Sequence, residues 1–211
     1  PVVSGIRNSL LVSACSAALS VYFSALTAYG IYAYNFKFKK AAFALILLIM
    51  TMPTQVSALG FLQLISKMGL KNSFIPLIVP SIAAPTVFFF MKQYLDASLP
   101  MEIVEAARID GASEAKTFVS IVLPMVKPGI GALAIFTFIN SWNDYFMQLI
   151  MLSSTSNLTI SLGIAKLQAE NSTDFGLIMA GAALAAVPII IIFLIFQKYF
   201  TKGIAMGAVK G

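Results

Sequence analysis

The residues that could contact a solute directly gather in one short run inside a long apolar interval. Asp144 is the one acidic residue in any such interval, and Asn140, Asn143 and Gln148 lie near it. At about 100° per residue, Thr137, Asn140, Asp144 and Gln148 share a narrow helical stripe, with Asn143 beside it. A charge at the centre of a membrane helix costs about 2.5–3.5 kcal/mol, so we expect Asp144 to face water or a partner.

The chemistry of this run suits a hydroxyl-rich solute. Amides and carboxylates can bind hydroxyl groups, and aromatic rings can pack against the C–H face of a sugar. The predicted solute-pathway residues are Asn140, Trp142, Asn143, Asp144, Tyr145 and Gln148. The alternative is a polar clamp that holds this helix to its neighbours, and side-chain chemistry alone favours that clamp.

Catalysis by this chain has little support in the sequence. It contains no histidine and a single cysteine, Cys15, which lies in an apolar run. No phosphate-binding Gly-x-x-x-x-Gly-Lys-Ser/Thr motif occurs, and we assign the glycine pair Gly129 and Gly131 to helix packing. We therefore predict no catalytic residue, no metal site and no cofactor bound by the chain. A membrane-embedded enzyme stays open as a weaker alternative, because one intramembrane acid makes a poor acid–base set.

The composition predicts an all-α integral membrane protein. The 211 residues are 59% hydrophobic and 10% charged, whereas a soluble domain carries about 25% charged residues. Because a span needs about 20 apolar residues, we expect five transmembrane helices, at about 9–34, 41–65, 73–91, 129–152 and 175–197. Pro76, Pro80 and Pro85 predict a kink in the third.

The basic residues predict the orientation. With the Lys37–Lys40 turn inside, ten basic residues fall in the cytoplasm and four outside. We expect one transmembrane domain over 1–211, with a cytoplasmic coupling loop at 92–128 and a cytoplasmic tail at 198–211. The apolar residues of the external loop, about 153–174, could lie on the membrane surface or touch an external partner. Because the chain opens at Pro1 and five spans would leave its N-terminus outside, we also expect a sixth span upstream.

The longest polar interval predicts two short helices joined by a glycine corner. Pro100 suits a first helical turn, Gly111 a left-handed C-cap and Ser113 an N-cap, and the second helix is expected to end before Pro124. The pattern places Leu99, Ile103, Ala106 and Ala107 on one face of the first helix, and Ala115, Phe118, Ile121 and Val122 on one face of the second. Such a knob could enter a groove on a partner protein.

This interval also resembles a known sequence motif. Glu105-Ala106-Ala107, then Asp110-Gly111-Ala112, then Ile121-Val122-Leu123-Pro124 is similar to the coupling motif of binding-protein-dependent ABC importer permeases. The resemblance implies that the loop docks on a cytoplasmic ABC ATPase dimer, which carries ATP and Mg. The implied coupling residues are Glu105, Ala106, Ala107, Asp110, Gly111, Ala112, Phe118, Leu123 and Pro124. The alternative is an ordinary helix-turn-helix in a membrane-protein loop.

Two further stretches resemble the maltose-type carbohydrate-uptake branch. They are Ser141-Trp142-Asn143-Asp144 and the ending from Lys202 to Gly211. The resemblance implies a sugar or oligosaccharide substrate, a bacterial inner membrane, a second and different permease, and an external sugar-binding protein. It also implies six spans. The basic residues flank apolar runs rather than forming a stripe with aromatic residues, so we expect no nucleic-acid partner. An ion-coupled secondary transporter, or an importer of a non-sugar solute, stays as an alternative.

Overall fold

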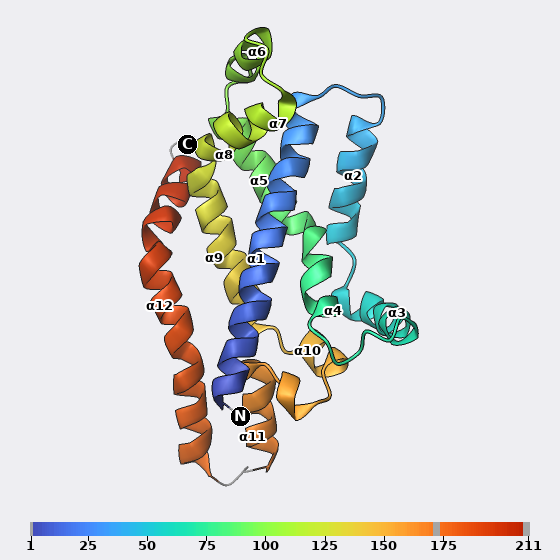
Figure 1. Ribbon diagram of the computed structural model, residues 1–211, viewed down its shortest axis with the longest axis vertical. Helices are drawn as coiled ribbons and strands as arrows, with labels where there is room; N and C mark the ends of the chain where they lie inside the picture. The colour runs from blue at the N-terminus through green and yellow to red at the C-terminus, as the bar shows by residue number, and fades with distance from the viewer. Residues whose placement is uncertain (1, 171–173, 209–211) are drawn as a thin grey trace. The chain divides into compact units, whose positions relative to one another are not determined.

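The computed structural model describes residues 2–170 and 174–208, with side chains described as far as Gln197. Every regular element in these ranges is helical (Figure 1). The α-helices are α1 (Val2–Ala33), α2 (Lys39–Met50), α3 (Thr54–Lys67), α4 (Ile75–Ile78), α5 (Pro85–Ser98), α6 (Met101–Ile109), α7 (Glu114–Thr117), α8 (Leu123–Met125), α9 (Lys127–Asn143), α10 (Phe146–Met151), α11 (Ile160–Glu170) and α12 (Phe175–Ala208). Short 3-10 turns occupy Val79–Ile82 and Thr155–Asn157, and a π-helical turn occupies Phe118–Val122.

The helices form two compact units. The first contains α1 up to Leu19, together with α3, α4, α10, α11, the end of α9 from Phe136, and α12 up to Ile195. The second contains the rest of α1 from Ser20, together with α2, α5 to α8, and α9 up to Ile135.

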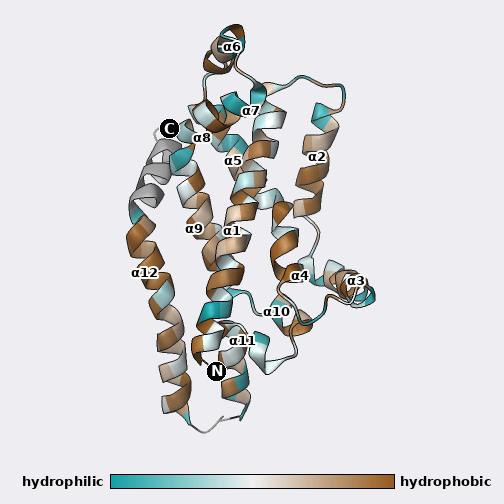
Figure 2. Cartoon of the chain, viewed as in Figure 1, coloured by the Kyte–Doolittle hydropathy of each residue, from teal (hydrophilic) through white to brown (hydrophobic). Residues whose placement is uncertain are grey.

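Within the described residues, three helical stretches are long and apolar enough to cross a membrane. They are Val2–Ala33, Ile75–Ser98 and Phe175–Gln197, and the number rises to five if each of two bent helix pairs is one span. Figure 2 shows apolar residues along much of α12, as such a crossing requires. A bend of 78° separates Glu114–Met125 from Lys127–Asn143. The chain therefore changes direction between the segment before this bend and α9.

Proline breaks the second and third apolar intervals. The predicted second span, 41–65, is broken into two helices, because α2 ends at Met50 and α3 starts at Thr54. Pro53 between them is extended, with φ −62° and ψ 125°; proline lacks an N–H and disfavours helix in the residue before it. The predicted kink at 73–91 is confirmed: α4 passes into a 3-10 turn, and α5 begins at Pro85.

The later boundaries also differ from expectation. The interval 129–152 is two helices, since α9 ends at Asn143 and α10 starts at Phe146. The expected external loop contains α11, whose Ile160 and Leu162 are buried rather than turned to lipid or a partner. Helix α12 continues to Ala208, so the expected tail begins as helix, and its last three residues lie outside the described part.

The core of the second unit is built on the last turns of α1 and on α5. Met91, Val104 and Val126 are fully enclosed there, and Phe88 and Leu95 pack with them. Gly129 permits a close approach of α9 to α5, since an added Cβ would lie 2.8 Å from the Tyr94 ring. Packing therefore explains this glycine, as predicted from the sequence.

Helix α1 also carries a line of buried hydroxyls that the sequence reading did not single out. Ser9, Ser13, Ser16, Ser20 and Ser24 are all at most 3% exposed, and their spacing of three or four residues places them on one face. Ser9 accepts a hydrogen bond from the Ile160 N–H at 2.8 Å. Small side chains on one face allow neighbouring helices to pack closely in a membrane protein.

Candidate functional site

The corner between α6 and α7 is closed by a glycine turn. Gly111 has a φ of +76°, and its N–H donates to the Arg108 carbonyl while the Ala112 N–H donates to the Ala107 carbonyl, both at 3.0 Å. This pair of bonds is a Schellman motif. The Ser113 hydroxyl then accepts from the Lys116 N–H at the start of α7. The predicted left-handed glycine and serine cap are both confirmed.

The segment after the corner departs from the predicted single helix. A π-helical turn over Phe118–Val122 follows α7, and Pro124 lies in the first turn of α8 rather than beyond a helix end. Proline is tolerated there because the first-turn N–H needs no helical partner. The chain then bends before α9.

The predicted alanine face of α6 is divided between the core and the surface. Val104 and Ala107 are buried, at 0% and 6% exposure, whereas Ile103 and Ala106 are exposed. Leu99 is buried as well, but it is extended, with φ −111° and ψ 105°, and so does not belong to the helix. The predicted apolar face of the second short helix is divided in the same way: Ala115 is exposed, whereas Phe118 and Val122 are buried in the π-helical turn.

The predicted coupling residues therefore differ in accessibility. Glu105, Ala106, Asp110, Gly111 and Pro124 are exposed, Ala112 and Leu123 are half-buried, and Ala107 and Phe118 are buried. Figure 1 shows α6 beyond the ends of α1 and α5 within their unit. Ile109 at the tip is 86% exposed. An apolar side chain beside acidic ones on a projecting helix suits contact with another protein.

A polar cluster that the sequence reading missed holds this corner to the end of α1. The Glu114 carboxylate accepts from Arg108 Nε at 2.7 Å and from the Tyr29 hydroxyl at 3.0 Å. Arg108 also donates to the Ala33 carbonyl at 3.4 Å, and its guanidinium lies 5.2 Å from the centre of the Tyr34 ring. No spacing rule brings residues 29 and 114 together, so only the fold could reveal this cluster.

The cluster keeps Glu114 ionised. The hydrogen bond from Arg108, followed by that from Tyr34, lowers the pKa of the Glu114 carboxyl from 4.5 to about 2, against burial, which raises it. A favourable hydrogen bond to the charged form of an acid lowers its pKa in this way. The pair of Arg108 and Glu114 is therefore charged at neutral pH.

The predicted solute residues do not form one helical stripe. The helix breaks at Asp144 and Tyr145, so Gln148 in α10 is out of register with Asn140 in α9. Asn140, Asn143 and Tyr145 are exposed, whereas Asp144 is half-buried and accepts from the Met147 N–H at 3.4 Å. Non-helical backbone at membrane depth is tolerated where it is buried in protein or lines a wet cavity.

Two of the predicted solute residues are buried against neighbouring side chains. Gln148 is 2% exposed; its amide donates to the Ser141 carbonyl at 3.2 Å and accepts from the Thr159 hydroxyl. Trp142 is 1% exposed and stacks on Phe138 with ring centres 5.7 Å apart. The Gln148 amide thus satisfies the Ser141 carbonyl just before the break, and Trp142 adds ring packing, so the contacts of both residues favour the clamp alternative.

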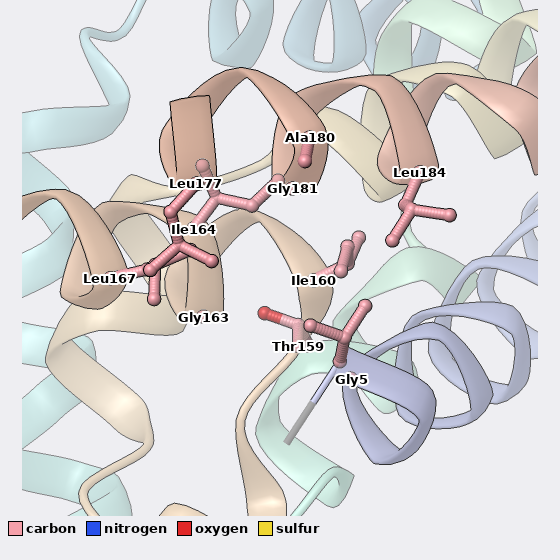
Figure 3. Close-up of a pocket in the computed structure, with 11 residues that line it drawn as sticks. Gly5, Thr159, Ile160, Gly163, Ile164, Leu167, Leu177, Ala180, Gly181 and Leu184 are labelled. Carbon is pink, nitrogen blue, oxygen red and sulfur yellow. The ribbon is translucent and has the colours of Figure 1, made fainter. Parts of the chain in front are cut away.

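A separate apolar cavity lies in the same unit, between α11 and α12 (Figure 3). Its volume is about 250 Å³. Figure 3 shows Ile164, Leu177 and Leu184 around it, with the Thr159 hydroxyl at one edge. A cavity with so few polar groups does not suit a sugar, whose hydroxyls need hydrogen-bond partners. Among the side chains described, those of residues 2–170 and 174–197, no three His, Cys, Asp or Glu residues are grouped as a metal site requires.

Comparison with known families covers nearly the whole chain. Residues 20–206 match the family described as the binding-protein-dependent transport system inner membrane component.

Several curated proteins are similar over most of their length. The arabinooligosaccharides transport system permease protein AraQ of Halalkalibacterium halodurans is 37% identical over 97% of this chain and 73% of its own. The melibiose/raffinose/stachyose import permease protein MelC of Bacillus subtilis is 34% identical over 97% of this chain and 75% of its own.

A solved structure has the same fold. A bacterial ABC transporter involved in the import of the acidic polysaccharide alginate superposes with a TM-score of 0.82 at 18% identity, over 93% of this chain and 74% of its own.

Proposed function

Because this chain belongs to the family of binding-protein-dependent transport system inner membrane components, we propose that it is the permease subunit of an ATP-driven importer of a sugar or oligosaccharide. The family match over residues 20–206 carries this proposal. The substrate class rests on relatives named for arabinooligosaccharides and for melibiose, raffinose and stachyose. The chain itself is a transport subunit and not an enzyme.

The projecting corner is the proposed ATPase contact. A separate cytoplasmic ATPase dimer would hold ATP and Mg and would receive the exposed side of α6, including Glu105, Ala106, Ile109 and Asp110. Exposure of these four side chains supports this role. Ala107 and Phe118 would support the corner from inside, since both are buried in this chain.

The helix break is the proposed contact with solute. Asn140, Asn143, Asp144 and Tyr145 lie at or next to the break and are exposed or half-buried. Discontinuous helices form solute sites in other transporters. A second, different permease would supply the other wall of the pathway, and an external binding protein would deliver the sugar. A similar solved structure is an alginate ABC transporter in complex with a pentasaccharide-bound periplasmic protein.

The basic residues support the proposed orientation, with five crossings and a cytoplasmic C-terminus. Single cysteines at Lys39 and Ser113, in a Cys15→Ala background, report it directly. We expect both to resist an impermeant thiol reagent added outside intact cells and to react after permeabilisation. Labelling of either one from outside contradicts this orientation.

Recovery of the native complex tests the function. We expect a tag on this chain to recover an ATPase, a second permease and a sugar-binding protein from detergent-solubilised membranes. In liposomes we expect ATP hydrolysis to rise with one member of a panel of arabinooligosaccharides, raffinose and stachyose. Uptake driven by an ion gradient without ATP would contradict the proposal.

A surface variant tests the ATPase contact. Ile109→Asp places a charge on the exposed tip, so we expect loss of ATPase recovery with normal membrane insertion. Phe38→Asp is the matched control, because Phe38 is 68% exposed and lies in the turn between α1 and α2. Equal ATPase recovery with both variants would remove the α6 tip from the interface.

A further inference from the structure

We propose that the hydroxyl groups of Tyr29 and Tyr32 fasten the end of α1 to both ends of α6, so that a displacement of α6 is passed to α1. The proposal rests on the proposed function, since α6 is the expected ATPase contact. It assigns these tyrosines as positioning residues that act through α6 and touch neither solute nor nucleotide.

The first tie holds the start of α6. The Tyr32 hydroxyl donates a hydrogen bond to the carbonyl of Leu99, two residues before α6 begins. Leu99 itself is 3% exposed and belongs to the unit's core. Lys92 steadies this tyrosine from α5, with its ammonium group 5.7 Å from the ring centre and an ion pair to Asp96.

The second tie holds the end of α6. Tyr29 donates to one oxygen of the Glu114 carboxylate, and Arg108, in the last turn of α6, donates to the other. Arg108 also reaches the Ala33 carbonyl, at the last residue of α1. The carboxylate therefore joins α1, α6 and α7 across the Gly111 corner.

The second tie is anchored on α1 by a closely packed tyrosine ring. Tyr29 is 3% exposed, and its ring centre lies 5.5 Å from that of Phe118, which is also 3% exposed. Tyr29 and Tyr32 are three residues apart, so they lie on the same side of α1. Close-packed interiors transmit strain rather than absorb it, and hydrogen bonds to an ionised group are the stronger kind. A shift of α6 relative to α1 would have to break both ties or move α1.

A tie that only stabilises the fold would behave differently from one that transmits movement. Loss of a structural tie lowers complex recovery, basal hydrolysis and stimulated hydrolysis together. Loss of a transmitting tie lowers the response to sugar while the ATPase stays bound and turns over.

The test uses the complex recovered through a tag on this chain and reconstituted in liposomes. The variants are Tyr29→Phe, Tyr32→Phe and their double; each substitution keeps the ring and removes its hydroxyl. Tyr22→Phe is the control, since Tyr22 lies on the same helix, is 46% exposed and makes ring contacts with Phe23 and Phe118. The probe is whichever oligosaccharide of the panel stimulates the wild-type complex most.

We expect the ratio of sugar-stimulated to basal ATP hydrolysis to fall about fivefold or more in the double variant, with ATPase recovery and basal hydrolysis close to wild type. The control is expected to keep the wild-type ratio. An unchanged ratio in the double variant overturns the proposal, and so does a decrease fully explained by lost ATPase recovery. A wild-type complex without ATPase or sugar stimulation would instead refute the proposed function.

Discussion

Replacing Gln148 by methionine separates a clamp from a solute contact. Methionine has a similar volume but cannot donate to the Ser141 carbonyl and is only a weak acceptor for the Thr159 hydroxyl, the two partners of the native amide. A buried polar group left without a partner costs about 1–3 kcal/mol. Because the Thr159 hydroxyl can rotate toward another acceptor whereas the carbonyl cannot, we expect a loss of about 2–3 kcal/mol of unfolding free energy in total.

Two further variants control this measurement. The double variant Gln148→Met/Thr159→Val also removes the Thr159 hydroxyl that Gln148→Met leaves without its partner. We therefore expect the double variant to lose less stability than the two single variants lose in sum. Asn143→Ala alters an exposed amide at the break. We expect it to leave stability near wild type and to reduce uptake or change sugar preference.

The assay combines thermal unfolding of the purified complex with uptake of several oligosaccharides by the same preparations. We expect Gln148→Met to unfold at a lower temperature with unchanged sugar preference. A Gln148→Met complex of wild-type stability with altered sugar preference would refute the clamp, and would return Gln148 to the solute pathway.

Three other predictions concern the corner and its support. At Gly111 an added Cβ meets no atom within 4 Å, so the cost of a substitution is only that of holding a residue with a Cβ in the left-handed conformation, about 1–2 kcal/mol. We expect Gly111→Asn to keep sugar-stimulated hydrolysis and Gly111→Val to lose it. Equal activity of the two variants would contradict this. Gly129→Ala is expected to displace the Tyr94 ring and lower the unfolding temperature. Adding Tyr94→Leu to this variant should partly restore the unfolding temperature. A Gly129→Ala variant as stable as wild type would show that α5 and α9 adjust to the added methyl group. The folded pKa of Glu114 is about 2, below its ordinary 4.5, so the stability it contributes is complete above about pH 4.5 and declines as the pH falls toward 2. We expect the difference in unfolding temperature between wild type and Glu114→Gln to be constant from about pH 8 to 5 and to become smaller below pH 5. A difference that already becomes smaller above pH 5 would contradict this pKa.

The sequence by itself determined the class of the protein and the chemistry of its corner. Sparse charge and long apolar runs are sufficient for a membrane protein because lipid excludes charged side chains. The turn at Gly111 and the cap at Ser113 are local, since each depends on residues within a few positions along the chain. The proline break before α5 is local for the same reason.

Tertiary structure decided everything that depended on which neighbours a helix meets. The phase of α6 could not be read from its apolar pattern, because Val104 rather than Ala106 faces the core, and because Leu99 is buried without being helical. Gln148 became a clamp only because the fold brings Thr159 and the Ser141 carbonyl to it. Tyr29 and Glu114 are 85 residues apart, and no local rule pairs groups at that distance along the chain. Their contact exists because the end of α1 packs beside the corner, and that packing is a property of the whole unit.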